Sequence, residues 1–210
     1  MSCTKSVVLS CAGIGSRLGL GLTKALLKIN GRSLISWQLE QFSEVEDLRI
    51  VVGFQAKSII EEVLSIRKDV TFVFNHLYFE TKTGASFYLG AKDARDEIIE
   101  WDGDLLVHPD DVKTILNTEG EFICYSDITS DGAVFCKTDE NGNVLAFSRE
   151  NGDYEWTGPA CIKKEHLTYS SNNVYNIFER VLPMKGLIIR AYDIDTYNDY
   201  KRVLEIIKNW

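Results

Sequence analysis

The first half of the chain alternates short apolar runs with segments of helical period, and this alternation limits the fold more than any other feature. The apolar runs cover residues 7–12, 48–53, 70–74 and 104–107. Helical spacing of apolar residues covers residues 35–42, 59–64 and 84–99. The runs do not alternate apolar with polar residues, which is typical of strands buried on both faces. We therefore expect a parallel sheet with helices on both faces and with ligands at the carboxyl ends of the strands.

The second half of the chain has a different pattern of predicted strands and helices. Residues 133–137 and 143–148 are strand-like and flank an Asn-Gly pair, which predicts a β-hairpin. Residues 174–181 indicate a helix, 187–190 a strand and 198–209 a closing helix. No repeat or linker interrupts the chain, so we expect one domain over residues 1–210. The predicted fold class is α/β: a Rossmann-like three-layer α/β/α domain with a mixed, mostly parallel sheet and a small hairpin insertion.

The charge balance limits the partners. Acidic side chains number 31 and basic ones 23, a formal net charge of −8. Nucleic acids and anionic membranes are bound through an excess of Lys and Arg, so the sequence predicts neither as a partner. No apolar run approaches the ~20 residues of a membrane span, and we expect a cytoplasmic protein. The 5 cysteines lack Cys-x-x-Cys spacing, which favours buried thiols over disulfides or zinc.

The segment after the first apolar run carries the strongest chemical signal. Gly13 and Gly15 allow a sharp turn whose N–H groups can approach phosphates, and Arg17 and Lys24 add positive charge. The pattern indicates a polyphosphate site, with a simple tight turn as the alternative. A dinucleotide fingerprint requires a third glycine where Leu18 stands, and the Gly-Lys-Ser/Thr of a Walker loop is absent.

Residues Leu9 to Leu39 resemble the opening signature of the NTP-dependent nucleotidyltransferases that act on sugar 1-phosphates and on phosphocholine. That signature is an Ala-Gly-x-Gly-x-Arg loop, a Pro-Lys pair and a Gly-x-Pro-Leu-Ile helix start. Thr23 and Ser33 stand where the two prolines are usual. The resemblance continues at residues 50–54, 72–75, 83–86 and 192–200.

The resemblance implies a set of site residues. Arg17 and Lys24 would be catalytic, Arg17 on the leaving pyrophosphate and Lys24 between the reacting phosphates. The nucleotide would be bound by Ala12, Gly13, Gly15, Ser16, Thr83, Gly84 and Ser86. Gly158 and Glu179 would meet the acceptor, and Asp110 and Asp195 would hold Mg²⁺. Asp111 and Asp193 are the rival metal ligands, and Pro109 replaces a usual glycine. Two carboxylates suffice because Mg²⁺ also takes phosphate oxygens and water.

The implied reaction transfers a nucleoside monophosphate from an NTP to a phosphorylated small molecule and releases pyrophosphate. The resemblance favours CTP, with UTP or GTP as alternatives. The acceptor would be a sugar 1-phosphate or a phosphocholine-like alcohol phosphate, used for cell-surface polysaccharides. Tyr154 and Trp156 could cover a sugar ring or surround a quaternary ammonium, or only pack within the hairpin. The alternative function is a nucleotide-binding sensor or inactive homologue, which Thr23 and Pro109 motivate.

Overall fold

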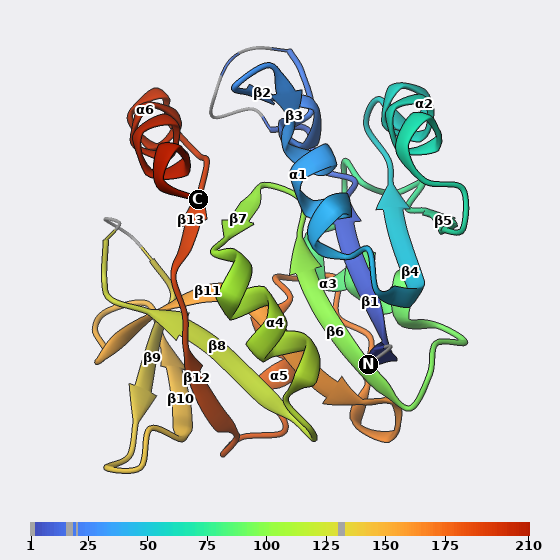
Figure 1. Cartoon of the computed structure of the whole chain (residues 1–210). Coiled ribbons are helices and arrows are strands. Elements are labelled where there is room, and N and C mark those ends of the chain that lie inside the picture. Colours follow the sequence, from blue (N-terminus) through green and yellow to red (C-terminus); the bar gives the residue numbers. More distant parts are fainter. Residues whose placement is uncertain (1–2, 16–18, 20, 130–132) are drawn as a thin grey trace.

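A mixed nine-stranded sheet forms the centre of the molecule (Figure 1). The computed structural model describes residues 3–15, 19, 21–129 and 133–210. The main path of the sheet runs in the order β10 (Val144–Ser148), β9 (Phe135–Thr138), β11 (Tyr154–Lys163), β6 (Glu97–Asp102), β1 (Cys3–Cys11), β4 (Val45–Val52) and β5 (Thr71–Phe74). Off this path, β8 (Phe122–Ser126) pairs with β11 and with β12 (Lys185–Ile188).

The half of the sheet from β6 to β5 is parallel, as the sequence predicts. Leu9 in the middle of β1 pairs with Ile50 of β4 on one side and with Trp101 of β6 on the other. The remaining parallel pair of this half joins β4 to β5. The carboxyl ends of these strands therefore meet at one edge of the sheet, where a ligand site is expected.

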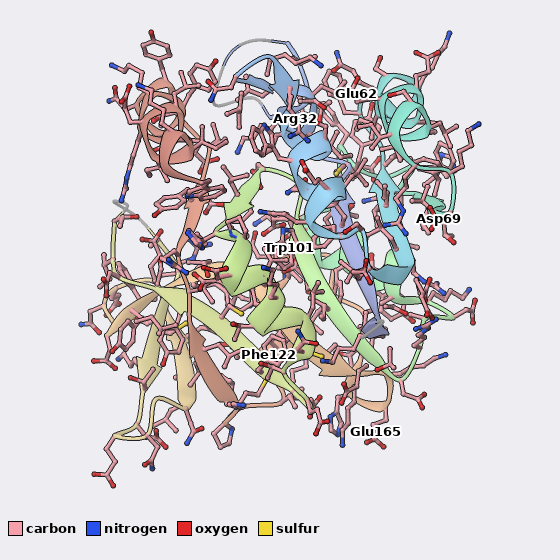
Figure 2. The ribbon with its side chains drawn as sticks, viewed as in Figure 1. Arg32, Glu62, Asp69, Trp101, Phe122 and Glu165 are labelled. Atoms are coloured by element: carbon pink, nitrogen blue, oxygen red, sulfur yellow. The ribbon has the colours of Figure 1, made fainter. Side chains whose placement is uncertain are left out.

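Helices cover both faces of the sheet and confirm the predicted three layers (Figure 1). On one face, α1 (Leu34–Gln41), α2 (Ala56–Ile66) and α4 (Pro109–Asn117) share a buried apolar cluster with β1 and β6. On the other face, α3 (Thr83–Ala91) and α5 (Tyr175–Phe178) form the second cluster. Figure 2 shows Trp101 in the middle of the molecule, where its ring meets Phe42 edge-on, and Asp69 and Glu165 at the periphery.

Two sequence predictions in the middle of the chain are wrong. The helix predicted over residues 84–99 ends at Ala91, because the chain turns through Asp93 at φ 59° and continues as β6. The run at 104–107 forms β7 (Leu105–Val107), which pairs with β13 (Ala191–Asp193) in a separate ribbon. The fourth parallel strand of the sheet is therefore β6, and its carboxyl end lies at Asp102.

The predicted hairpin is confirmed as the antiparallel pair β9 and β10, whose turn contains Gly142 at φ 80°. The long strand β11 was not predicted, although it pairs with β6, β8 and β9 and so joins the two halves of the sheet. The closing helix is α6 (Tyr197–Ile206), which begins with a reciprocal capping box between Thr196 and Asp199. A short ribbon of β2 (Lys28–Ile29) and β3 (Arg32–Ser33) lies near it. No helix in the described ranges is both long and apolar enough to cross a membrane.

Candidate active site

A cleft of about 330 Å³ opens at the carboxyl ends of β1 and β6. Three parts of the chain line it. The glycine loop supplies Gly13, Gly15, Thr23 and Lys24, the start of α3 supplies Thr83, and the acidic segments supply Asp102, Gly103, Asp104, Asp193 and Asp195. The cleft therefore combines a glycine loop, a cation and carboxylates at the edge where the fold predicts a ligand.

Lys24 lines this cleft as a buried cation, with 8% of its surface exposed. It begins a single 3₁₀ turn, Lys24–Leu26, that follows the glycine loop. Its Nζ lies 2.6 Å from Oδ2 of Asp104 and also pairs with Oδ1 of Asp195. Burial lowers the pKa of Lys24, but the two carboxylates outweigh burial and raise the pKa above its ordinary value. The ammonium is thus charged and fixed in position.

Asp102 and Asp104 flank Gly103 at the end of β6. A Cβ on Gly103 would lie 2.7 Å from Sγ of Cys11 and 2.7 Å from the carbonyl oxygen of Ser10, so only glycine allows this close turn. Burial, and then the charge of Asp104, raise the pKa of Asp102 to about 7. The turn therefore brings two carboxyl groups to one side of the cleft.

Two more carboxyl groups line the cleft at the end of β13, Asp193 in the strand and Asp195 just after it. Part of the Asp193 residue is exposed to solvent. The pKa of its carboxyl group is nevertheless raised well above the usual range, first by desolvation of that group and then by the charges of Asp104, Asp102 and Asp195. Burial, and then the charge of Asp102, also raise the pKa of Glu100 beneath the cleft. The carboxyl groups of the cleft therefore disfavour one another's ionised forms.

The donor set fits Mg²⁺. No group of three described His, Cys, Asp or Glu side chains is close enough to hold a metal by itself. Mg²⁺ does not need one, because it is held by one or two carboxylates together with phosphate oxygens and water. Asp102 at the end of β6 and Asp195 in the loop after β13 both line the cleft and provide that pair. The two carboxylates could therefore hold Mg²⁺ together with the oxygens of a bound polyphosphate.

Asp110 and Asp111 do not belong to this cleft, which corrects the predicted metal ligand Asp110. In the β7–β13 ribbon, Asp193 lies opposite Leu105 at the cleft end, and Asp110 follows the other end of β7. The Asp110 side chain is 71% exposed and lies 3.9 Å from Lys113. Asp111 instead forms a bidentate ion pair with Arg190, at 2.9 and 2.8 Å. The acidic residues that do line the cleft here belong to the sequence Asp-Gly-Asp at the end of β6, which the sequence-based prediction did not include.

The glycine loop is only partly described. Gly13 and Gly15 line the cleft. Gly15 has φ 66°, and a Cβ there would lie 3.1 Å from Cγ of Lys24. Ala12 is buried and is not among the residues that line the cleft; its carbonyl oxygen accepts a hydrogen bond from the N–H of Phe54. The predicted nucleotide contact Ser16 and the predicted catalytic residue Arg17 lie outside the described residues.

Of the three predicted nucleotide contacts at the start of α3, Thr83 lines the cleft, whereas Gly84 and Ser86 contact other parts of the protein. Thr83 lines the cleft, and its Oγ1 accepts a hydrogen bond from the N–H of Val174. A Cβ on Gly84 would lie 2.7 Å from the carbonyl oxygen of Asn172. The Ser86 hydroxyl is buried and accepts from Nδ2 of Asn75. Gly84 and Ser86 therefore fix the helix start that presents Thr83.

The two predicted acceptor residues are placed differently. Gly158 in β11 has φ 104°, and a Cβ there would lie 3.1 Å from Oδ2 of Asp102, so Gly158 adjoins the cleft. Glu179 follows α5 and is exposed, with Oε2 bonded by Nδ2 of Asn176. It is not among the residues that line the cleft.

The aromatic residues of β11 pack within the domain. Tyr154 stacks on Tyr125 at 4.5 Å, and Trp156 meets Phe147 edge-on at 5.2 Å between ring centres. These contacts agree with the interpretation that Tyr154 and Trp156 pack within the protein.

A second cavity of about 70 Å³ adjoins the cleft and shares Asp193 and Asp195 with it.

A parallel α/β sheet with a glycine loop, a buried lysine and converging carboxylates at its strand ends defines a nucleotide-binding protein that handles polyphosphates. The comparison with protein families gives the same class. A model of the MobA-like NTP transferase domain matches residues 7–153, and the chain belongs to this nucleotidyltransferase family.

Curated relatives are distant. The choline-phosphate cytidylyltransferase of Streptococcus pneumoniae is 25% identical, over 98% of this chain and 99% of that protein. The bifunctional protein GlmU of a Cyanothece strain is 33% identical over 63 residues, which are 29% of this chain and 14% of that protein.

Solved structures show the same fold at low sequence identity. The inositol-1-phosphate CTP transferase from T. maritima has a TM-score of 0.83 at 17% identity, covering 99% of this chain and 96% of that one. The CTP:phosphocholine cytidylyltransferase from Streptococcus pneumoniae has a TM-score of 0.76 at 19% identity, covering 96% and 98%. The Rossmann-like mixed sheet is therefore confirmed by both the topology and the neighbours.

Proposed function

We propose that this protein transfers a nucleoside monophosphate from an NTP to a phosphorylated small molecule and releases pyrophosphate. The observation that carries the proposal is the meeting of the glycine loop, Lys24 and four aspartates in one cleft. An acidic protein that concentrates a buried cation beside a glycine turn is suited to a ligand that carries several phosphates.

The proposed reaction is one displacement at phosphorus. An oxygen of the acceptor phosphate forms a bond to the α-phosphorus of the NTP, while the bond from that phosphorus to the bridging oxygen breaks and pyrophosphate leaves. The acceptor needs no general base, because a phosphate monoester has a second pKa of about 6 and is mostly dianionic at neutral pH. The protein must instead align two anions and offset their repulsion.

The described residues divide this work. The backbone at Gly13 and Gly15 borders the cleft and can approach the phosphate chain. Lys24 is fixed where an anion can contact its ammonium, and we keep Arg17 as the proposed contact of the leaving pyrophosphate. Asp102 and Asp195 would hold Mg²⁺, which when bound supplies charge neutralisation at the phosphates.

We propose CTP as the nucleotide, with UTP or GTP as the alternatives, and a sugar 1-phosphate or phosphocholine-like alcohol phosphate as the acceptor. Two of the neighbours with the same fold are named as CTP enzymes, one for an inositol phosphate and one for phosphocholine. Products of this kind serve the assembly of cell-surface polysaccharides, which we propose as the pathway.

The test is a matrix of four NTPs against phosphorylated sugars and alcohols, with pyrophosphate release as the readout. We expect turnover with Mg²⁺ for one nucleotide and one acceptor class. Asp102→Asn should lose at least about 100-fold in kcat, as for the loss of one preorganised charge contact. Asp110→Asn is the matched control and should retain wild-type turnover. Nucleotide binding without turnover for every acceptor would instead indicate the sensor.

A further inference from the structure

Gln55 starts α2 in a backbone conformation that helix formation does not explain. Its φ and ψ are 52° and 33°, in the left-handed region that non-glycine residues rarely adopt. Gln is not a preferred helix N-cap, and its side chain makes no capping hydrogen bond to α2. Capping of α2 therefore does not account for the left-handed backbone at Gln55, and another contact of this residue must stabilise it.

The Gln55 side chain is bonded instead to the end of the glycine loop. Its Oε1 accepts a hydrogen bond from the N–H of Thr23 at 3.0 Å, and its Nε2 donates to the carbonyl oxygen of Gly21 at 3.0 Å. A backbone N–H can only donate and a carbonyl can only accept, so one orientation of the amide satisfies both. The side chain thus clamps the backbone on both sides of Leu22.

The clamp acts on the residue that precedes Lys24. Thr23 is 2% exposed, and its carbonyl oxygen accepts from the N–H of Leu26 at 3.0 Å, which closes the 3₁₀ turn. Both polar backbone groups of Thr23 are therefore held, the N–H by Gln55 and the carbonyl by the turn. Lys24 begins from this fixed point and extends to Asp104 and Asp195.

Residue 23 itself shows why such a clamp is needed. Its φ is −62°, the value to which a proline ring would restrict it. Threonine has no ring to hold that angle, but unlike proline it has an N–H that can bond to Gln55. The hydrogen bond and the ring are thus alternative ways of fixing the same backbone.

We propose that Gln55 is a positioning residue, which holds Thr23 so that Lys24 points into the cleft for the nucleotide. The kinetic part of this inference rests on the proposed function, whereas the structural part does not. The clamp acts through backbone geometry, and Gln55 itself need not touch the nucleotide.

The kinetic test uses Gln55→Ala, Thr23→Pro and the double variant. Loss of two hydrogen bonds should lower kcat/KM for the NTP about tenfold in Gln55→Ala, with the KM of the acceptor unchanged. Thr23→Pro should bring the double variant back to within about twofold of wild type, since the ring restores φ without the bond. Equal kcat/KM in wild type and Gln55→Ala, or no rescue by proline, would overturn the proposal.

Two further variants separate positioning from general stability. Gln41→Ala is the matched control, because Nε2 of Gln41 donates to the carbonyl oxygen of Val107 away from the cleft. It should lower the melting temperature and leave kcat/KM unchanged. Gln55→Glu keeps the volume and the acceptor but loses the donor, so it should show a smaller loss of kcat/KM than Gln55→Ala.

Amide hydrogen exchange tests the clamp without any turnover. In the ligand-free protein the Thr23 amide should exchange about tenfold faster in Gln55→Ala than in wild type, and at the wild-type rate in Gln41→Ala. Unchanged Thr23 exchange in Gln55→Ala would refute the clamp. If Thr23 exchanges faster in Gln55→Ala than in wild type, but the wild type turns over none of the NTP and acceptor pairs, the proposed function is refuted and the clamp is supported.

Discussion

The ammonium of Lys24 holds two carboxylates that would otherwise repel each other, so its replacement affects the cleft as well as the ligand. We predict that Lys24→Met lowers kcat by about 100-fold to 1,000-fold, equal to about 3–4 kcal/mol, which is typical for one preorganised contact at a developing charge. Pyrophosphate release measures the effect. A melting curve provides the control for folding, and full turnover by Lys24→Met would contradict the assigned role.

Gly158 and Gly120 both have a positive φ, but only a side chain at position 158 would contact Asp102, so the two positions separate backbone strain from contact with the cleft. Their φ values are 104° and 75°, and a Cβ at position 120 would meet nothing within 4 Å. Gly120→Ala should cost about 1 kcal/mol of unfolding free energy, from strain alone. Gly158→Ala should cost about 1–3 kcal/mol and also lower turnover, because its Cβ would press on Asp102. Unfolding in urea, with kinetics on both variants, tests this; unchanged turnover in Gly158→Ala would show that Asp102 moves freely.

At the scale of elements, β6 shows why the acidic cluster was only half predicted. In its sequence Glu-Ile-Ile-Glu-Trp-Asp, Glu97 and Glu100 are three apart with apolar residues between, and this spacing also suits a helix that continues from α3. Glu100 is fully buried in a strand, which local sequence rules do not anticipate. Because the sequence pattern does not predict this strand, it places the proposed metal ligand after β7 and not at the end of β6.

The ion pair between Asp111 and Arg190 joins α4 to the segment before β13, and it should make stability depend on pH. Burial alone would raise the pKa of Asp111, but the bonds from Arg190 outweigh it and lower the pKa below the ordinary value of 3.8. The stabilisation is therefore present above that value and is lost as the pH falls through the lowered pKa. Asp111→Asn should be modestly less stable than wild type at neutral pH and nearly equal to it in strong acid.

Chemical denaturation at several pH values measures this difference. Asp110→Asn is the control, since the Asp110 carboxylate is 71% exposed and its contacts with His108 and Lys113 are long, at 3.8 and 3.9 Å. It should follow wild type throughout. A constant gap between Asp111→Asn and wild type at all pH values would show that packing, and not the ion pair, causes the loss.

For the whole molecule, the sequence predicted the layers better than the connections. The β1, β4 and β5 strands and the α1 and α2 helices follow from apolar runs and helical spacing, and they place Gly13, Gly15 and Lys24 correctly. The strands β8 and β11 depend on pairing between residues far apart, such as Ala160 with Glu100 and Ile123. Local pattern does not specify such pairing, which is set by the packing of the whole sheet.

The charge of the cleft also predicts a global response to ligands. Because the carboxylates repel one another, Mg²⁺ together with the NTP should stabilise the folded protein by about 2.7 kcal/mol at a hundredfold excess over the dissociation constant. That corresponds to a melting temperature higher by several degrees. Thermal melts with and without a chelator measure it, with KCl of equal ionic strength as the control. An equal shift in Asp102→Asn would contradict the proposed metal ligand.

Because Lys24 is already ion-paired, a bound nucleotide must replace or share the carboxylates that contact its ammonium. A phosphate that reaches this ammonium does not find an unpaired cation, because Asp104 and Asp195 already hold it and must be displaced or shared. An uncharged nucleoside cannot compete with two carboxylates at this distance, whereas a chain of phosphates can. We therefore expect the cleft to stay empty in the presence of nucleosides that share the base and sugar of the substrate.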